Sequence, residues 1–430
     1  MNRFVFLVVA SLILAACGAA GPAGGPAGSP AQQAPKEIVI GAVYPLTGPQ
    51  APTGLDLKNA VELAVDLINS GNKDLNLPLV KDGPGLKNLG GAKLKVIFGD
   101  SQADPAKGQA ETERLYTSEN VVAVVGAYNS AVTATASQAA ERLQRPFFNP
   151  ESSSPTLVAR GFKWFFRSTP DDQMFAENFF QFLSDVDKKN PGTVTKKVAI
   201  LHEDGLFGSD VNKFSREFAA KYGFEVVTSV AYKATAPDLS SEVQRLKASG
   251  APILIQASYL ADATLALRAM KQIDANFTIL AMDAGFVDTQ FIPNLKKDAD
   301  FWITREVWAK DLAARKPLVK QVNDLYRAKY NTDMNGSSAR AFTGVFVLAD
   351  AINRARSSEP AKLQDALRGT DIPADQIIMP WDGIKFDERG QNTKGRGIMV
   401  QIQNGEYVTV WPFELASKPL VWPIPTWSKR

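Results

Sequence analysis

The chain has 430 residues, of which 45% are apolar and 22% are charged, which is the composition of a soluble globular protein. This length exceeds one ordinary hydrophobic core and is enough for two compact domains. The net charge of +3 comes from interspersed acidic and basic residues, so a nucleic-acid partner is not expected. The single cysteine excludes internal disulfide bonds.

The N-terminal segment has the pattern of a secretion signal. Residues 4–16 form an unbroken apolar run, too short for a transmembrane helix, that ends in a Leu-Ala-Ala-Cys sequence resembling the lipobox of bacterial lipoproteins. We therefore predict a lipoprotein signal peptide over 1–17 with a lipidated Cys17, and a Gly/Pro/Ala-rich flexible tether over 18–35. The expected location is the outer face of a bacterial membrane, in the periplasm or at the cell surface. The alternative is a plain secretory signal with a chance cysteine.

Short apolar runs and amphipathic segments alternate along the chain and then alternate again. This pattern predicts an α/β protein with two doubly wound, Rossmann-like lobes in series. The expected strands cover residues 38–44, 93–98, 121–126, 146–148, 197–201, 224–231, 252–256 and 278–282. A run at 301–307, helices over 318–330 and 339–355, and a hairpin that pairs 383–387 with 397–402 are expected further on.

The sequence contains little catalytic equipment. It has no Gly-x-Gly-x-x-Gly after the first expected strand, no phosphate-binding P-loop and no Gly-x-Ser-x-Gly elbow. One histidine and one cysteine exclude a His/Cys zinc site, so no cofactor and no metal are expected. We expect binding rather than catalysis; the alternative is a hydrolase in which His202 serves a Ser-His-Asp set.

Polar and aromatic residues follow most of the expected strands. In open α/β sheets, ligands sit outside the carboxyl ends of the strands, where helix N-termini offer free N–H groups. Loops 127–130 and 149–154 are therefore expected to hold the polar end of a small molecule. Other readings are that Ser130 is an N-cap and that Asp283 is a surface acid. The candidate aromatic pocket walls are Tyr44, Tyr128, Phe207 and Phe286.

Several short motifs together resemble one protein family. They are Pro45-Leu46-Thr47-Gly48, Asp104-Pro105, Val125-Gly126, residues 149–155, Phe207-Gly208 and residues 384–387. Their order and spacing over residues 36–415 resemble the type I periplasmic binding proteins, and most closely the branched-chain amino-acid (Leu/Ile/Val)-binding group of ABC importers. The resemblance implies two lobes, joined by three crossovers, that close on a ligand by hinge motion. The first lobe would comprise 36–166 and about 306–395, and the second 167–305 and about 396–430.

The resemblance also implies roles for particular residues. Ser130, Glu151 through its backbone, and Ser153 would hold the carboxylate of an amino acid, and Asp283 would hold its ammonium group. Tyr259 and Phe207 would close over the ligand. Glu151 and Ser153 replace the smaller Ala and Thr of amino-acid binders, which favours an amide or urea-like ligand as an alternative. The implied partners are this small molecule and ABC permease subunits; a sensor that docks a receptor is the alternative.

Overall fold

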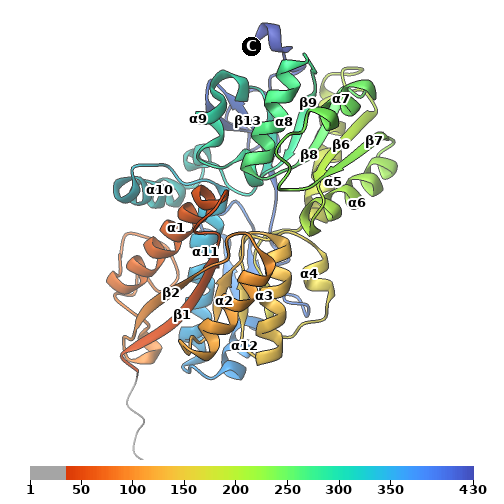
Figure 1. Ribbon diagram of the computed structural model, residues 1–430. Coiled ribbons are helices and arrows are strands. Elements are labelled where there is room, and N and C mark those ends of the chain that lie inside the picture. The colour runs from red at the N-terminus through yellow and green to blue at the C-terminus, as the bar shows by residue number, and fades with distance from the viewer. Residues whose placement is uncertain (1–34) are drawn as a thin grey trace, which may run out of the picture. The chain divides into compact units, whose positions relative to one another are not determined.

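A computed structural model of the chain describes residues 35–430. Residues 1–34, with the predicted signal peptide, Cys17 and most of the predicted tether, lie outside the described part. Within 35–430, no helix combines the length and the apolar character needed to cross a membrane. Two separate sheets carry helices on their faces, which confirms the predicted α/β class (Figure 1).

The first sheet has five parallel strands in the order β2-β1-β3-β4-β5. Its short central strands are continuous apolar runs because both faces of the sheet are covered. Along β1, Ala42 faces one core and Val43 the other, as the two-residue period of a strand requires. The strands are β1 (Glu37–Tyr44), β2 (Lys93–Asp100), β3 (Val124–Gly126), β4 (Phe147–Asn149) and β5 (Phe165–Arg167).

Helices cover both faces of this sheet. On one face α1 (Ala51–Ser70) packs against α11 (Gly336–Ala355), and on the other α2 (Pro105–Thr117) packs against α3 (Ser130–Leu143). Most of α11 is buried, as expected of a helix that is apolar nearly all round. Two further helices, α4 (Thr156–Ala159) and α12 (Pro360–Arg368), belong to the same region.

The second sheet has seven strands in the order β14-β13-β10-β9-β8-β6-β7, and only β13 and β14 run antiparallel to their neighbours. Its helices α5 and α6 share the core on one face, and α7, α8 and α9 share the core on the other. The strands are β6 (Lys197–Glu203), β7 (Glu225–Tyr232), β8 (Ile253–Ala257), β9 (Thr278–Met282), β10 (Ile303–Glu306), β13 (Ile398–Gln403) and β14 (Glu406–Trp411). The helices are α5 (Asp172–Lys189), α6 (Leu206–Lys221), α7 (Ser240–Ala248), α8 (Leu260–Gln272) and α9 (Phe291–Leu295). Short 3-10 turns are η1 (Lys87–Leu89), η2 (Ala284–Phe286), η3 (Lys296–Ala299), η4 (Lys310–Ala314), η5 (Ala374–Gln376) and η6 (Trp427–Lys429).

The chain passes three times between the part built on the first sheet, here called the first lobe, and the part built on the second sheet, the second lobe. The passages run from β5 to α5, from β10 through α10 (Pro317–Tyr330) to α11, and from β12 to β13. This arrangement agrees with the predicted two-lobed fold. The predicted residue boundaries of the lobes stay a prediction, because the connecting segments belong to neither sheet.

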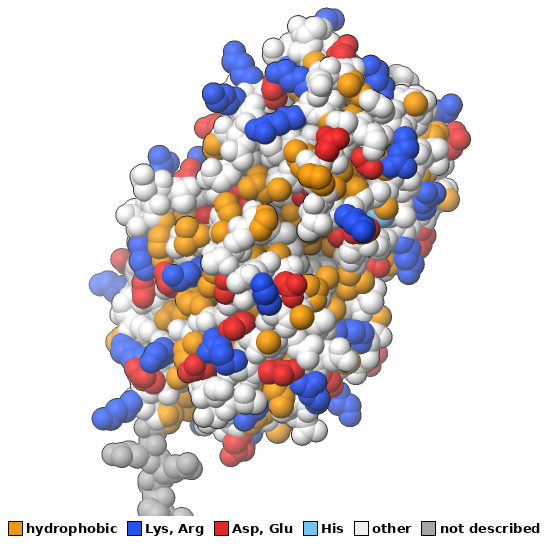
Figure 2. All heavy atoms as spheres, viewed as in Figure 1, with side chains coloured by type: hydrophobic (Ala, Val, Ile, Leu, Met, Phe, Trp, Pro, Cys, Tyr) orange, Lys and Arg blue, Asp and Glu red, His pale blue; other side chains and the backbone are white. Residues whose placement is uncertain are grey.

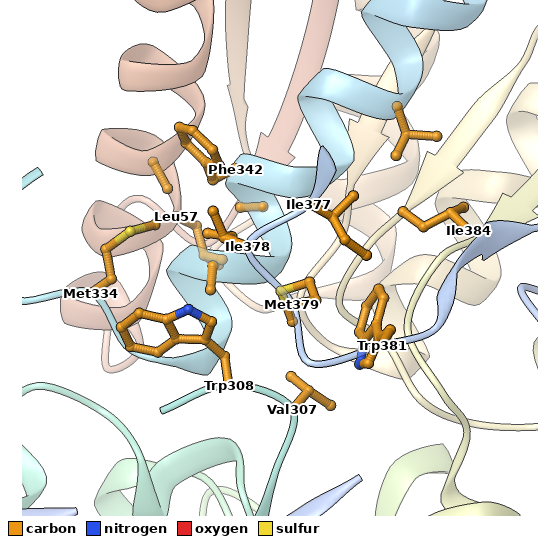
Figure 3. Packing of buried hydrophobic residues seen from close by; sticks show 14 of the residues in the cluster. Leu57, Val307, Trp308, Met334, Phe342, Ile377, Ile378, Met379, Trp381 and Ile384 are labelled. Atoms are coloured by element: carbon orange, nitrogen blue, oxygen red, sulfur yellow. The ribbon is translucent and has the colours of Figure 1, made fainter. Parts of the chain in front are cut away.

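A buried cluster anchors the second passage on the first lobe. Trp308 of the passage lies beside Met334, from the segment before α11, on the side of Leu57 of α1, and Val307 lies on the side of Met379 (Figure 3). Phe342 of α11 belongs to the same buried cluster. Full burial of each such apolar side chain contributes roughly 1.5–3 kcal/mol to stability. The N-terminal half of α11 is therefore held firmly, which matters for the site described below.

The predicted pairing of 383–387 with 397–402 is wrong. β12 (Gly383–Lys385) pairs with β11 (Asp371–Pro373) instead, and β13 forms its hairpin with β14. Asn404 and Gly405 link β13 to β14 with φ values of 53° and 75°. Two positive φ values in a two-residue Asn-Gly loop are typical of a tight hairpin turn, and this local signal decides the pairing.

The exposed face seen in Figure 2 mixes acidic and basic side chains with scattered apolar atoms. No single sign of charge dominates this face, in keeping with the net charge of +3.

Candidate functional site

One small cavity lies between the two sheets, where strands of both end. About 20 Å³ of it is open to the centre of a water molecule, which is room for about one water. All seven residues predicted to bind ligand line it, together with three others: Tyr128, Ser130, Glu151, Ser152, Ser153, Phe207, Tyr259, Asp283, Ala284 and Arg340. The structure thus brings the predicted residues together, and that they bind a ligand stays a prediction.

The first-lobe wall consists of the loops that follow β3 and β4. Gly126 ends β3 with φ +135°, and a Cβ there would lie 2.4 Å from the carbonyl oxygen of Val43, so the turn requires glycine. The Asn149 amide donates to the carbonyl oxygen of Gly126 at 2.8 Å, and the Ser152 hydroxyl donates to that of Ala127 at 2.8 Å. These bonds hold the two loops as one rigid wall.

Ser130 is the first residue of α3, and Asn129 occupies the N-cap position. The reading of Ser130 as an N-cap is therefore wrong. Its hydroxyl accepts from the backbone N–H of Ser154 at 3.4 Å and borders the cavity. A helix N-terminus at a cavity wall favours a partial negative charge on a bound group.

Three aromatic rings close the cavity across the lobes. Tyr259 lies with its ring centre 5.8 Å from that of Tyr128 and 5.7 Å from that of Phe207. Tyr128 belongs to the first lobe, Phe207 to the first turn of α6, and Tyr259 to the loop after β8. A Cβ at Gly285 would lie 2.2 Å from the backbone carbon of Tyr259, so the segment after β9 can approach the backbone of Tyr259 this closely only with glycine.

Asp283 is not a surface acid. It is 3% exposed, and its Oδ2 accepts from Arg305 Nη1 at 2.6 Å and from Arg340 Nη1 at 2.7 Å, while Oδ1 accepts from the backbone N–H of Ala284. Burial acts to raise the pKa of Asp283, but the two guanidinium groups outweigh it and hold the pKa below its ordinary value. The φ of +24° at Asp283 is a strained conformation, of the kind that concentrates at functional sites.

Glu151 has an arginine partner from a distant part of the chain. Arg340 Nε donates to Glu151 Oε2 at 2.9 Å, whereas Glu151 Oε1 is buried without a hydrogen-bond partner. Burial raises the pKa of Glu151 to about 8, although Arg340 opposes the rise. Arg340 therefore bridges Glu151 of the first lobe and Asp283 of the second.

Sequence reasoning missed Arg340. It lies within the predicted helix 339–355 between alanine residues, and it is 3% exposed. One signal in the sequence could have identified it: an arginine flanked by apolar residues in a helix that is expected to be buried. Such an arginine is almost never buried unless it has a charged partner, so a partner could have been sought. Its partner Glu151 lies 189 residues away in the sequence, so the pairing itself could not be predicted from the sequence.

Two of the four aromatic residues expected to form pocket walls do not line the cavity. Phe286 packs on Phe291 and Trp302, with ring centres 5.3 and 5.9 Å away, so its reading as a pocket wall is wrong. Tyr44 is buried and does not line the cavity. Thr53 donates to Asp288, which adds a direct contact between α1 and the second lobe.

His202 lies in the core of the second sheet. It is 6% exposed, and its Nδ1 lies 2.8 Å from the carbonyl oxygen of Glu203. Within residues 35–430, no side-chain hydrogen bond joins it to a serine or an aspartate. In the same range, no group of three or more His, Cys, Asp or Glu residues is arranged to hold a metal ion.

Comparison with known proteins defines the family. A sequence model of the periplasmic binding protein family matches residues 37–406, so the chain belongs to this family. Among curated relatives, Leu/Ile/Val-binding protein homolog 7 of Brucella abortus is 27% identical over 385 residues, covering 88% of this chain and 92% of that protein. Homolog 8 of the same organism is 28% identical over 385 residues, covering 87% and 91%.

Solved structures share the fold, which is that of the type I periplasmic binding proteins. A leucine-binding protein from Thermotoga maritima superposes with a TM-score of 0.74 at 19% identity, over 88% of this chain and 99% of that chain. A solute-binding protein of an ABC transporter from R. palustris, in complex with benzoate, superposes with a TM-score of 0.73 at 13% identity, over 87% and 95%. Proteins of this family bind solutes outside the cytoplasm.

Proposed function

We propose that this protein is the extracytoplasmic solute-binding component of an ABC importer. It binds an amino acid or a related small amide between its lobes and delivers it to the permease subunits. It performs no chemistry on the solute. Lipidation of Cys17, followed by a flexible tether, anchors it at the outer face of the membrane while leaving the lobes free to move.

One observation carries this proposal. Loops from both lobes place hydroxyl, aromatic and charged side chains around a single cavity at the carboxyl ends of both sheets. A solute there would contact both lobes at once and so stabilise the closed arrangement. That is the requirement for a ligand to drive hinge closure.

The solved relatives show that this fold accepts different solutes. One relative, from Streptococcus pneumoniae, holds isoleucine, and another, from R. palustris, holds benzoate. The aromatic trio of Tyr128, Phe207 and Tyr259 offers apolar surface to the body of a solute. The polar loops and Arg340 offer hydrogen bonds to its head group.

A thermal-shift screen against amino acids, amides, short peptides and aromatic acids tests the proposal. A binding solute should raise the melting temperature and reduce the radius of gyration measured by X-ray scattering. Ser130→Ala and Asp283→Asn should weaken the response to the solute that binds. No response to any member of the panel would contradict the proposed function.

A further inference from the structure

The charged groups at the cavity are paired with one another before any solute is considered. Glu151 and Asp283 are the two carboxylates that line it, and Arg340 lies between them. Arg305 adds a second guanidinium on the far side of Asp283, and its Nη2 lies 3.8 Å from Asp172. All five side chains are at most 5% exposed.

Asp283 has little capacity left for a cationic solute group. Its Oδ2 accepts from two guanidinium groups, and its Oδ1 accepts from the N–H of Ala284. An ammonium group at this carboxylate would lie beside both arginines, and like charges at this separation repel strongly in a buried site. The acid that would ordinarily recognise an α-ammonium group is thus already occupied.

Glu151 has a hydrogen-bond acceptor, and Arg340 has hydrogen-bond donors, that no group within residues 35–430 uses. Glu151 Oε1 is buried and has no hydrogen-bond partner. Arg340 makes three hydrogen bonds, to Glu151, Asp283 and Ser337, out of the five that a guanidinium group can donate. A buried acceptor without a partner costs about 1–3 kcal/mol, so a solute that donates to Oε1 recovers this free energy.

From this pairing we infer that the cavity selects a neutral solute with a primary amide or urea-like head group. Its N–H donates to Glu151 Oε1 and its carbonyl oxygen accepts from Arg340. The inference rests on the proposed function and narrows it. When Glu151 is ionised, a solute carboxylate would face its negative charge, and an ammonium group would face Arg340. Each of these solutes therefore brings an unmatched charge into a buried site, whereas a neutral amide does not.

Matched sets of solutes test the inference by calorimetric titration. The first set is propionamide, L-alanine and propionate, and the second is isovaleramide, L-valine and isovalerate. Burial raises the pKa of Glu151 to about 8, so the titrations are run at pH 9, where the carboxylate form dominates. In each set we expect the amide to bind with a Kd at least about tenfold lower than those of its two charged counterparts, which corresponds to about 1.4 kcal/mol.

Tighter binding of L-alanine, L-valine or either carboxylate than of the matching amide would overturn the inference and leave the proposed function standing. Binding by none of the six would also overturn it. If the thermal-shift screen also shows no binding of any amino acid, amide, peptide or aromatic acid, the proposed function is contradicted as well.

A charge-neutral variant gives a second test. At pH 9, where Glu151 of the wild type is ionised, Glu151→Gln leaves Arg340 without its first-lobe counter-charge, so propionate should gain at least about tenfold in affinity relative to propionamide. Glu113→Gln is the matched control, because Glu113 pairs with Arg142 at 2.6 Å on the surface of the first lobe. An unchanged propionate-to-propionamide ratio in folded Glu151→Gln would contradict the inference. If that variant does not fold, Glu151→Asp keeps the charge and should keep amides ahead of carboxylates; reversal of this order would contradict the inference.

Discussion

At the scale of single residues, Arg340 organises the site. It is the cation through which a first-lobe carboxylate and a second-lobe carboxylate are held on opposite sides of one cavity. Glu151, whose side chain replaces the smaller residue of amino-acid binders, is the first-lobe partner of this arginine. The sequence predicted the acids because they follow strands, but it could not predict Arg340, because only the fold brings α11 to these loops.

Loss of Arg340 should destabilise the folded protein strongly. Arg340→Gln leaves Glu151 and Asp283 buried without the cation between them, and breaking a buried ion pair in this way costs about 3–5 kcal/mol. Urea unfolding monitored by circular dichroism measures the change. Lys362→Gln is the control, because its pair with Glu359 is 57% and 66% exposed and should contribute less than about 1 kcal/mol. Equal effects of the two variants would contradict this role for Arg340.

Buried acids should make stability fall as the pH rises. Burial raises the pKa of Glu151 to about 8, and that of each of Asp56, Asp172, Asp262 and Glu306 to about 7. The folded protein therefore binds more protons than the unfolded chain between about pH 4 and pH 8, so this contribution is full below the unfolded pKa values and is lost as the pH rises through the folded ones. We expect the melting temperature to drop by at least about 3 °C between pH 5.5 and pH 8.5.

The part of this slope that belongs to Glu151 can be isolated. Glu151→Gln does not titrate, so its melting temperature should depend less on pH between 5.5 and 8.5 than that of the wild type. Differential scanning calorimetry at several pH values measures both slopes. A steeper slope in the variant would contradict the assigned titration.

At the scale of elements, the site depends on loops that approach one another closely. Gly126 at the end of β3 and Gly285 after β9 each lie where a Cβ would meet neighbouring backbone at 2.4 Å or less. Arg167 at the end of β5 donates to the carbonyl oxygen of Ser154 at 2.6 Å and to Gln391 Oε1 at 2.6 Å. It thereby ties the Ser-rich loop of the cavity to the third passage between the lobes.

A methyl group at Gly285 should displace the loop after β8. Gly285→Ala places a Cβ 2.2 Å from the backbone of Tyr259, and we expect a loss of about 1–3 kcal/mol together with weaker solute binding. Gly369→Ala is the matched control: its Cβ would meet nothing closer than 3.5 Å, so stability and binding should stay near those of the wild type. Chemical unfolding and calorimetric titration report the two effects. Wild-type binding by Gly285→Ala would show that the Tyr259 loop does not form part of the site.

Most elements could be predicted because buried parallel strands appear as continuous apolar runs. β9, for example, covers Thr278–Met282, the predicted residues. The pairing of β12 was not predictable from its pattern, since its partner β11 is only three residues long and contains Pro373. The hairpin of β13 and β14 was predictable from Asn404 and Gly405, because an Asn-Gly pair favours a tight hairpin turn. This local preference outweighs the pattern that suggested pairing 383–387 with 397–402.

At the scale of the whole molecule, function follows from having two sheets rather than one. Each lobe supplies an incomplete set of groups. The first offers hydroxyls, the Tyr128 ring, Glu151 and Arg340, and the second offers Asp283 and two aromatic rings. Only their approach across the three passages completes the cavity. The repeated strand–helix alternation of the sequence predicted the two lobes. The solute head group could not be predicted in the same way, because it depends on ion pairs between residues that only the fold brings together.

The most direct test of the central claim is hydrogen–deuterium exchange with and without the solute that binds best. A solute held between the lobes should slow amide exchange in both first-lobe loops, 127–130 and 149–154, and in the second-lobe segments 206–208, 258–260 and 283–286. Protection in both sets of loops is the predicted result. Protection confined to one lobe, or lying outside these loops, would contradict the account.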